Sequence, residues 1–397
     1  MTMPSSLRIL ALESFDGGAH AAVRHAIERW GRSAWTWVTR PDRAWKWRMR
    51  VSSAELLQEA GAAGLLDDAW DAIFVTSLTP VADLRAFLPP HLRTVPIILY
   101  MHENQVAYPN RHVTVEEAKR DHHFAITNLT SMLASDCVIF NSAWNRDSFL
   151  TGIDAVLSHQ PDQITHEWIE SIGAKSVIAW PPVDLEPVDR EATVLHNTPT
   201  VVWPCRWEHD KGPERLLEIA RQYSDAWDLR WIILGGQSSS IPPEMALFLD
   251  EQGDRILHAG FVEDRAAYLQ WLSRGDWVLS TAHHEFFGLA VAEALLMGCL
   301  PWLPDTLSYP ELLPESAKGL SPGEPPDDPK AIRRACVDHL RPALAVNAVS
   351  KIEQIIAAVI QKGPPSPFWE PCVGRFATWN KRRLGGGAAF GARGDGP

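Results

Sequence analysis

Short runs of apolar residues recur along the whole chain, and each run is followed by a polar loop and a segment rich in helix-forming residues. In the first half of the chain the predicted strands are residues 7–13, 72–76, 96–101, 137–141 and 176–180. In the second half they are residues 200–204, 230–235, 255–258, 277–280 and 300–303. Regular alternation of strands with helices predicts an α/β protein built on parallel sheets.

A polar stretch that contains several prolines, residues 181–199, separates the two sets of predicted strands and is interpreted as a linker. We therefore expect two Rossmann-like domains, residues 1–187 and residues 188–363, that face each other across a cleft. Ligands of open parallel sheets bind outside the carboxyl ends of the strands, so the loops that follow the strands should carry the functional residues.

The composition is that of an ordinary soluble protein, with 397 residues of which 46% are hydrophobic and 22% charged. No apolar run is long enough to span a bilayer, and residues 7–12 fit a first strand better than a signal peptide. The 5 cysteines are scattered and lack Cys-x-x-Cys spacing, which argues against disulfides and structural zinc. We expect a cytoplasmic protein with no membrane partner.

The net charge of -12 argues against sequence-independent binding of nucleic acid over a large surface. It does not argue against a local basic patch. Whether the chain binds nucleic acid therefore depends on where the cations cluster along the chain.

The segment His284-Glu285-Phe286-Phe287-Gly288-Leu289-Ala290-Val291-Ala292-Glu293 places two carboxylates around a glycine. Glu285 is expected in the loop after a buried strand and Glu293 on the following helix, so that both can face one ligand. Gly288 would let the backbone of Leu289 approach that ligand, and a helix N-terminus favours an anion there. The alternative is a surface helix that happens to carry two glutamates.

A second segment, residues 201–214, runs from a short apolar strand into a polar loop, and Pro213 then opens a helix. Arg206 and Lys211 flank the loop. Two cations at a helix N-terminus suit a diphosphate, which gains negative charge as it leaves. Taken alone, the two cations could equally be solvated surface charges.

A glycine loop follows the first predicted strand, where Gly17 and Gly18 precede a helix. Glycines allow backbone N–H groups to face a phosphate or an acceptor. An ordinary tight turn explains the same pair of residues equally well, so the pair by itself is a weak indication of donor binding.

Polar side chains also follow two later strands of the first half. The residues are His102, Glu103, Asn104, Gln105 and Asn141. His102 would lie at a strand end near the reacting carbon of a sugar, and its neighbours can recognise several hydroxyl groups. Pairs of adjacent histidines elsewhere are poorly spaced for one helix face, so we expect no metal ion.

One run of the chain is both basic and aromatic. It comprises Trp35, Trp37, Arg40, Arg43, Trp45, Lys46, Trp47, Arg48 and Arg50. Indole rings stack on bases and cations hold phosphates, so the run is a candidate surface for a single-stranded nucleic acid. A half-buried strand or helix edge with solvated arginines fits the same pattern.

These segments together carry a resemblance to a known family. The Glu285-x7-Glu293 pattern resembles that of retaining glycosyltransferases of family 4, and longer runs are similar to the tRNA-queuosine alpha-mannosyltransferases. Those runs are WKWRMR, HENQVAYP, FNSAWNRDSFL, WPCRWEHDKGPE, HHEFFGLAVAEAL and the later SYPE. The resemblance extends from residue 7 to about residue 315, and residues after 318 show no match.

The resemblance implies a hexosyltransferase that moves mannose from GDP-mannose to the queuosine of a tRNA anticodon loop, with retention and without a cofactor. It assigns donor contacts to Gly17, Gly18, Gly288 and Leu289, the diphosphate to Arg206 and Lys211, the sugar to Glu285, and the ribose to Glu293. The resemblance also implies the GT-B architecture, in which two Rossmann-like domains face a central cleft and the chain crosses back to the first domain, here expected at residues 364–384. The glycine-rich residues 385–397 are expected to be disordered.

The chemistry would be carried by His102, Glu285, Arg206 and Lys211. The acceptor would be held by Trp45, Lys46, Trp47, Arg48, Arg50, His102, Glu103, Asn104, Gln105 and Asn141. Two other hypotheses remain open at this point: a transferase that acts on a lipid or a small carbohydrate, and a tRNA-binding relative without catalytic activity.

Overall fold

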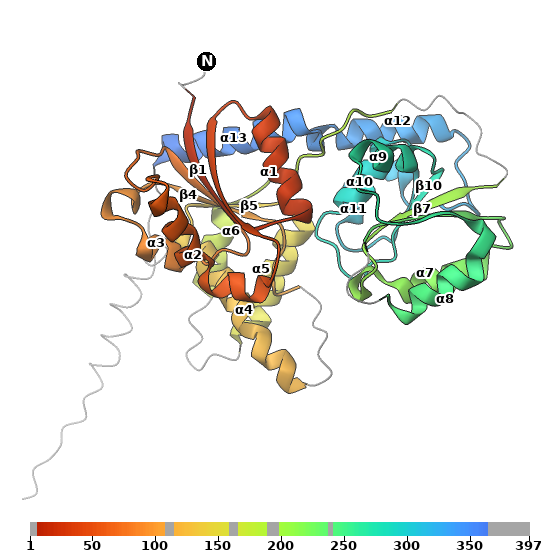
Figure 1. Cartoon of the computed structure of the whole chain (residues 1–397), viewed down its shortest axis with the longest axis horizontal. Coiled ribbons are helices and arrows are strands. Elements are labelled where there is room, and N and C mark those ends of the chain that lie inside the picture. The colour runs from red at the N-terminus through yellow and green to blue at the C-terminus, as the bar shows by residue number, and fades with distance from the viewer. Residues whose placement is uncertain (1–5, 108–114, 159–165, 189–197, 237–240, 364–397) are drawn as a thin grey trace, which may run out of the picture.

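The computed structural model describes residues 6–107, 115–158, 166–188, 198–236 and 241–363, and for residues 115–122 and 166 it describes only the backbone. Within these residues the chain forms two α/β domains, each built on a parallel sheet (Figure 1). The predicted fold class is therefore confirmed. The expected crossover at residues 364–384 and the expected disordered tail at residues 385–397 lie outside the described residues.

The N-terminal domain contains a six-stranded sheet in the order β2-β1-β3-β4-β5-β6. Its strands are β1 (Arg8–Asp16), β2 (Ala34–Pro41), β3 (Ala72–Thr76), β4 (Ile97–Met101), β5 (Cys137–Phe140) and β6 (Ser176–Ile178). Its helices are α1 (Gly18–Trp30), α2 (Trp45–Ala62), α3 (Val81–Phe87), α4 (Val115–Ala134), α5 (Ala143–Leu157) and α6 (His166–Ala174). All neighbouring strands run parallel, which directs their carboxyl ends to one edge of the sheet.

Strand β2 is the element of this sheet that the apolar pattern did not predict. Among the described strands it pairs with β1 alone, at the edge of the sheet, and most of its side chains are half-buried. Trp35 and Trp37 stack on each other with centroids 5.8 Å apart, and both contact the buried ring of Phe74. These two tryptophans therefore cover the sheet and do not form a nucleic-acid surface.

The C-terminal domain contains a five-stranded parallel sheet in the order β11-β10-β7-β8-β9. Its strands are β7 (Thr200–Pro204), β8 (Arg230–Leu234), β9 (Ile256–Gly260), β10 (Trp277–Leu279) and β11 (Leu300–Trp302). Its helices are α7 (Pro213–Tyr223), α8 (Pro243–Gln252), α9 (Arg265–Ser273), α10 (Leu289–Leu296), α11 (Tyr309–Leu312) and α12 (Pro329–Leu340). The apolar runs predicted all five of these strands. Strands β7, β8 and β10 are nearly continuous apolar runs buried on both faces, whereas β9 alternates half-buried and exposed residues.

The last described helix, α13 (Ala345–Lys362), returns the chain to the N-terminal domain, ahead of the segment where we expected the crossover (Figure 1). Ile352 and Ile356 pack on the N-terminal sheet, and Val349 packs against α1. Glu353 accepts hydrogen bonds from the backbone N–H of Ser33 and from Trp35 Nε1, at 2.8 and 3.0 Å. The helix thereby ties the two domains together. No helix within the described ranges is both long and apolar enough to cross a membrane.

Candidate active site

A cavity of about 160 Å³ lies between the carboxyl edges of the two sheets. The N-terminal domain and the linker contribute Ala19, His20, His102, Glu103, Asn141 and Pro181 to its wall. The C-terminal domain contributes Arg206, Asp210, Lys211, His284, Glu285, Phe286, Phe287, Gly288 and Leu289. The predicted site residues from four different strand ends thus meet in one place.

Lys211 lies in this wall, at the end of a short 3-10 turn between β7 and α7. Its Nζ lies 3.1 Å from Glu285 Oε2 and 3.4 Å from Asp210 Oδ2. Burial alone lowers the pKa of Lys211, but the two carboxylates outweigh burial and hold that pKa above its ordinary value. The side chain is therefore a fixed cation beside the cavity.

The backbone conformation of Gly212 allows Lys211 to lie close to Glu285. Its φ of +66° is in the left-handed region, and a Cβ at this position would lie 2.1 Å from the carbonyl O of Thr281. Only glycine lets the loop after β7 approach the loop after β10 this closely. We therefore expect any larger residue at this position to separate the cation from its carboxylate.

Arg206 also follows β7 and lines the cavity, and its side chain is 62% exposed. Its Nη2 lies 3.5 Å from Glu208 Oε2, so the guanidinium keeps most of its hydration. Burial raises the pKa of Glu103, while the positive charges of His20, Arg206 and Lys211 oppose that rise. Cations of the C-terminal domain therefore face a carboxyl group of the N-terminal domain across the cavity.

The Glu285-x7-Glu293 segment has the expected arrangement of loop and helix. Gly288, with φ of +90°, is the N-cap of α10, Glu285 precedes it in the loop, and Glu293 lies on the helix. Glu293 is buried and accepts a hydrogen bond from Arg265 Nη2 on α9. It does not line the cavity, whereas Glu285 and Leu289 do.

The glycine loop after β1 approaches another loop rather than lining the cavity itself. A Cβ on Gly17 would lie 2.2 Å from a side-chain oxygen of Asp42, whereas no atom of the described residues lies within 4 Å of the position of a Cβ on Gly18. The next two residues, Ala19 and His20, line the cavity in place of the glycines.

The asparagines that follow β4 and β5 hold the loops in place. Asn104 Nδ2 donates to Asn145 Oδ1 at 2.9 Å, and Asn104 Oδ1 accepts from the backbone N–H of Ala107 at 2.8 Å. Asn141 Nδ2 donates to the carbonyl O of His102 at 2.7 Å, and Asn141 Oδ1 accepts from Asn145 Nδ2 at 2.8 Å. Their carboxamides are thus already engaged, so Asn104 and Asn141 position the loop that carries His102. Gln105 is half-buried and does not line the cavity.

The second part of the basic and aromatic run, residues 45–50, forms the first two turns of α2. Trp47 is 62% exposed, and Lys46 and Arg50 are exposed as well. Lys46 Nζ lies 5.6 Å and Arg50 Cζ 5.4 Å from the centroid of Phe124. Trp45 is half-buried against the same ring. The exposed side of the first two turns of α2 is therefore positively charged, and it also presents the exposed indole ring of Trp47.

Arg48 differs from the expectation for this run. It is 5% exposed, and its Nη1 lies 2.5 Å from Glu55 Oε2 two turns further along α2. Arg40 pairs with Glu59 at 3.0 Å. A guanidinium that is buried and already neutralised is not available to a phosphate, so Arg48 is left out of the proposed acceptor surface.

Two direct contacts join the domains beside the cavity. Ser142 Oγ donates to the carbonyl O of Phe286. Glu311, on α11, accepts hydrogen bonds from the backbone N–H groups of Ala143 and Trp144 in the first turn of α5. A carboxylate at a helix N-terminus is a favourable arrangement, so Glu311 stabilises the apposition of the domains that forms the cavity.

His284 gives this region a pH dependence. Burial lowers the pKa of His284 from 6.5 to about 4. Between these pH values the unfolded chain binds more protons than the folded one, so the free energy of unfolding falls as the pH falls from 6.5 to 4.

We expect His284→Asn to remove up to about 3 kcal/mol of this fall, at about 1.4 kcal/mol per pKa unit. Urea unfolding at several pH values measures this free energy of unfolding. The exposed His91 supplies the control His91→Asn. Equal pH slopes for the His284 variant and the wild type would contradict the assignment.

Several residues of this region were not predicted from the sequence. They are Glu13, His20, Arg265 and Glu311. A glutamate in an otherwise apolar first strand was a usable signal for Glu13, because an unpartnered buried carboxylate is costly. The partners of Arg265 and Glu311 lie 28 and up to 168 residues away along the chain, and no local pattern indicates them.

Comparison with known proteins gives one family by sequence. The family described as "tRNA-queuosine alpha-mannosyltransferase N-terminal" matches residues 8–183. The tRNA-queuosine alpha-mannosyltransferase of Drosophila melanogaster is 34% identical over 318 residues, which cover 77% of this chain and 82% of that relative.

Solved structures are similar in fold at low sequence identity. Anabaena HepE in complex with UDP has a TM-score of 0.53 at 16% identity, covering 90% of this chain and 98% of that chain. A UDP-forming alpha,alpha-trehalose-phosphate synthase from Burkholderia vietnamiensis has a TM-score of 0.60 at 13% identity, with the same coverages. Together with the two parallel sheets, these likenesses confirm the predicted GT-B fold.

Proposed function

The chain belongs to the tRNA-queuosine alpha-mannosyltransferase family, and from this premise we propose that it transfers mannose from GDP-mannose to the queuosine of a tRNA anticodon loop. The observation that carries the proposal is the cavity between the domains, where the buried cation Lys211 and the carboxylate of Glu285 lie opposite His102. The cavity thus combines a positive charge that can bind a diphosphate with polar side chains that can bind a sugar.

The donor would lie along the C-terminal wall. Lys211 and Arg206 would hold the diphosphate, and the N-terminus of α10 at Gly288 and Leu289 adds backbone N–H groups beside it. Glu293 is paired with Arg265, whose side chain is 49% exposed. The hydroxyls of the ribose would thus hydrogen-bond to the Glu293 carboxylate beside the guanidinium of Arg265, which is exposed enough to move.

The reaction requires no protein nucleophile in this proposal. The bond between the sugar carbon and the diphosphate oxygen breaks, the acceptor hydroxyl attacks the same face of the sugar, and its proton passes to the leaving diphosphate. The fixed cations stabilise the charge that develops on that diphosphate. Burial and the neighbouring His20 hold the pKa of His102 well below its ordinary value, so His102 is a neutral hydrogen-bonding group beside the sugar.

The donor nucleotide can be tested by thermal stabilisation. A nucleotide present at 100 times its Kd adds about 2.7 kcal/mol to the free energy of unfolding. We expect GDP to raise the melting temperature and UDP or ADP at the same concentration to raise it much less. A response to UDP without a response to GDP would overturn GDP-mannose as the donor. Lys211→Ala serves as the matched control, because it should weaken the response to every nucleoside diphosphate.

The acceptor loop would lie on the exposed start of α2. Lys46 and Arg50 would contact phosphates, and the free face of Trp47 would stack on a base. Phe15, near the carboxyl end of β1, packs in the same cluster as Trp45, so this surface lies at the carboxyl edge of the sheet, where the cavity opens.

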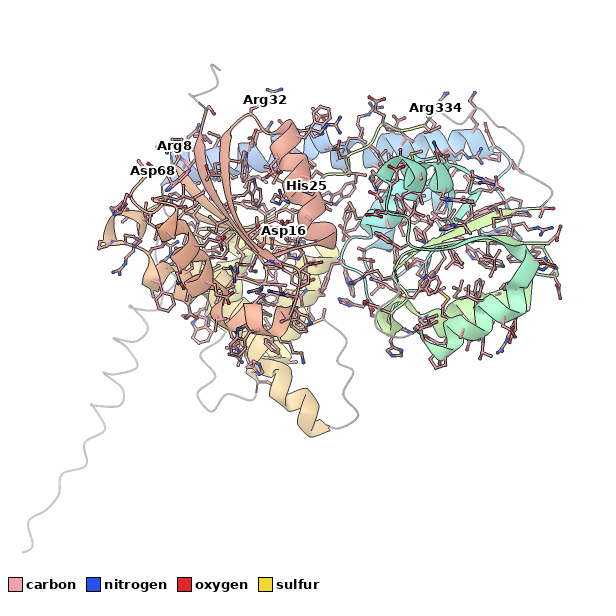
Figure 2. The ribbon with its side chains drawn as sticks, in the orientation of Figure 1. Arg8, Asp16, His25, Arg32, Asp68 and Arg334 are labelled. Carbon is pink, nitrogen blue, oxygen red and sulfur yellow. The ribbon has the colours of Figure 1, made fainter. Side chains whose placement is uncertain are left out.

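Removing these two cations together should weaken tRNA binding and reduce its salt dependence. Each lost phosphate contact to a single strand lowers the slope of log K against log salt by about 0.7. We therefore expect Lys46→Ser with Arg50→Ser to flatten the slope by about 1.4, with nucleotide binding unchanged, in a filter-binding titration. The control replaces Arg32 and Arg334, two exposed arginines along the opposite edge of the molecule (Figure 2). An unchanged slope in the α2 variant would place the tRNA elsewhere.

A further inference from the structure

Three carboxylates of the described residues line the cavity, and two of them are paired with one cation. Lys211 Nζ lies 3.1 Å from Glu285 Oε2 and 3.4 Å from Asp210 Oδ2. The third carboxylate belongs to Glu103, which follows His102 at the end of β4. Within the described part of the chain it makes no hydrogen bond and no close ion pair. The mechanism above gives this side chain no role.

The carboxyl group of Glu103 lies among charges from both domains. Burial raises its pKa, and the positive charges of His20, Arg206 and Lys211 oppose that rise without cancelling it. The side chain is half-buried, so water solvates it only in part. A carboxylate that is withdrawn from water and has no contact partner is costly. A cationic ligand in the cavity would remove that cost.

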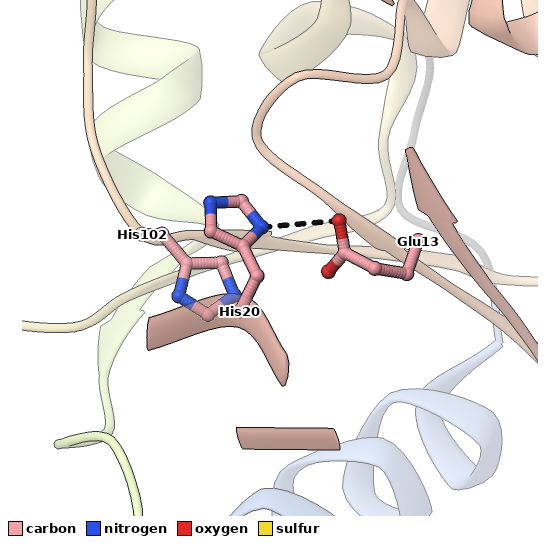
Figure 3. Close-up of side chains that lie close together, drawn as sticks. All are labelled: Glu13, His20 and His102. Atoms are coloured by element: carbon pink, nitrogen blue, oxygen red, sulfur yellow. Dashed lines mark hydrogen bonds and ion pairs between the residues drawn. The ribbon is translucent and has the colours of Figure 1, made fainter. Parts of the chain in front are cut away.

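The neighbouring acids of the N-terminal domain are already satisfied inside the domain. Glu13 Oε1 lies 3.0 Å from His20 Nδ1, and both side chains are buried (Figure 3). Asp16 Oδ1 accepts a hydrogen bond from Arg24 Nε at 2.9 Å. Among the described residues of this wall, Glu103 is therefore the acid that remains for a ligand.

The proposed acceptor carries a positive charge next to its reacting group. Queuosine bears its cyclopentenediol on a secondary aliphatic amine, and such an amine is protonated at neutral pH, as the amine of lysine is. When a hydroxyl of the diol reacts in the cavity, the ammonium group necessarily lies close by. Guanosine, the nucleoside that queuosine replaces, has no cation at this place.

The donor is a poorer partner for this carboxylate. Its diphosphate is negative and would be held by Arg206 and Lys211, the cations whose charges reach Glu103. Like charges repel, so Glu103 weakens the binding of a diphosphate at that place. A hydroxyl of the mannose could donate a hydrogen bond to Glu103, but it would leave the charge of the carboxylate uncompensated.

We propose that Glu103 binds the protonated secondary amine of the acceptor nucleoside and thereby distinguishes queuosine from guanosine. The inference rests on the proposed function and names what selects its acceptor. A charge-assisted hydrogen bond from the ammonium is about twice as strong as one between neutral groups. Glu103 is thus a specificity residue, which selects the acceptor by its charge.

The first test removes the charge of Glu103. Glu103→Gln keeps the size of the side chain, and Glu170→Gln, at an exposed position of α6, is the matched control. We expect kcat/KM for queuosine-containing tRNA to fall about 10- to 100-fold, mainly through KM, because a hydrogen bond to a charged group is lost. The affinities for GDP and GDP-mannose should stay the same or increase, because a charge that repels the diphosphate is gone.

The second test removes the charge of the acceptor and leaves the protein unchanged. Acetylation of the amine of queuosine abolishes its charge, whereas methylation adds bulk and leaves the amine protonated. We expect the wild type to lose about 10- to 100-fold in kcat/KM on the acetylated tRNA and much less on the methylated one. Glu103→Gln should discriminate far less between acetylated and unmodified tRNA, because each change removes the same interaction.

Three results would overturn the inference. The first is a Glu103→Gln variant with the wild-type KM for queuosine-containing tRNA. The second is an equal penalty for acetylation in the variant and in the wild type. The third is a loss of affinity for GDP-mannose without a loss for GDP, which would assign Glu103 to the sugar. All three leave the proposed function in place. A folded wild type that neither binds GDP nor transfers mannose would instead overturn both proposals.

Discussion

Replacing Lys211 by alanine is expected to lower the rate of mannose transfer by about 10²–10³-fold, as does the loss of one preorganised donor in other active sites. Its Nζ lies 3.1 Å from Glu285 Oε2 and is kept charged by two carboxylates, so the cation is in place before the leaving group develops charge. The measurement is kcat under saturating donor and acceptor, with thermal unfolding to verify that the variant is folded.

The controls for this prediction separate charge from fold. Removing Lys211 leaves Glu285 and Asp210 near each other without their cation, which by itself can destabilise the chain by about 3–5 kcal/mol. Lys211→Arg keeps the charge and should lose less activity than the alanine variant. Lys318→Ala removes a lysine whose partner, Glu315, is exposed, and should have no effect. A folded Lys211→Ala enzyme with full kcat would refute the diphosphate assignment.

The second large effect is expected for Glu311→Ala, with a fall in kcat/KM of about 10- to 100-fold. The carboxylate accepts two backbone hydrogen bonds across the domain interface, and a hydrogen bond to a charged group contributes about 1.5–3 kcal/mol. Without it the closed arrangement of the domains becomes less populated, and the apparent affinity falls with that population. Steady-state kinetics measure the fall in kcat/KM, and small-angle X-ray scattering measures the loss of the closed arrangement.

A closed and an open arrangement differ in radius of gyration, so Glu311→Ala should be larger in solution than the wild type. Glu315→Gln, in the turn that follows α11, removes an exposed carboxylate and serves as the matched control. If Glu311→Ala kept both the wild-type radius and the wild-type kcat/KM, the contact between Glu311 and α5 would have no part in closing the site.

The fold was predictable where the strands are buried on both faces. Strands such as β7 and β10 are continuous apolar runs, because a parallel sheet covered by helices presents no polar face. Strand β2 has one neighbour and half-buried tryptophans, so its pattern resembled an aromatic surface. In the same run Arg48 is paired with Glu55, which lies seven residues ahead on the same face of α2, and helical spacing could have indicated the pair.

The site was predictable where function needs a residue type at a strand end. Lys211, Glu285 and His102 follow buried strands, and parallel topology brings such ends to one edge. The role of each side chain was less predictable, because it depends on hydrogen bonds to residues that lie far away along the chain. Asn104 had the chemistry of a sugar ligand, but in the folded chain its carboxamide is bonded to Asn145.

The central proposal is tested most directly by following radiolabelled mannose from GDP-mannose into tRNA. The chain is incubated with tRNA that carries queuosine and, separately, with the same tRNA carrying guanosine in its place. We expect label in the queuosine-containing tRNA alone, and none when Lys211→Ala replaces the wild type. Equal label in both tRNAs, or label only in a lipid or small-carbohydrate fraction, would contradict the proposed acceptor, and nucleotide binding without any transfer would contradict the proposed activity.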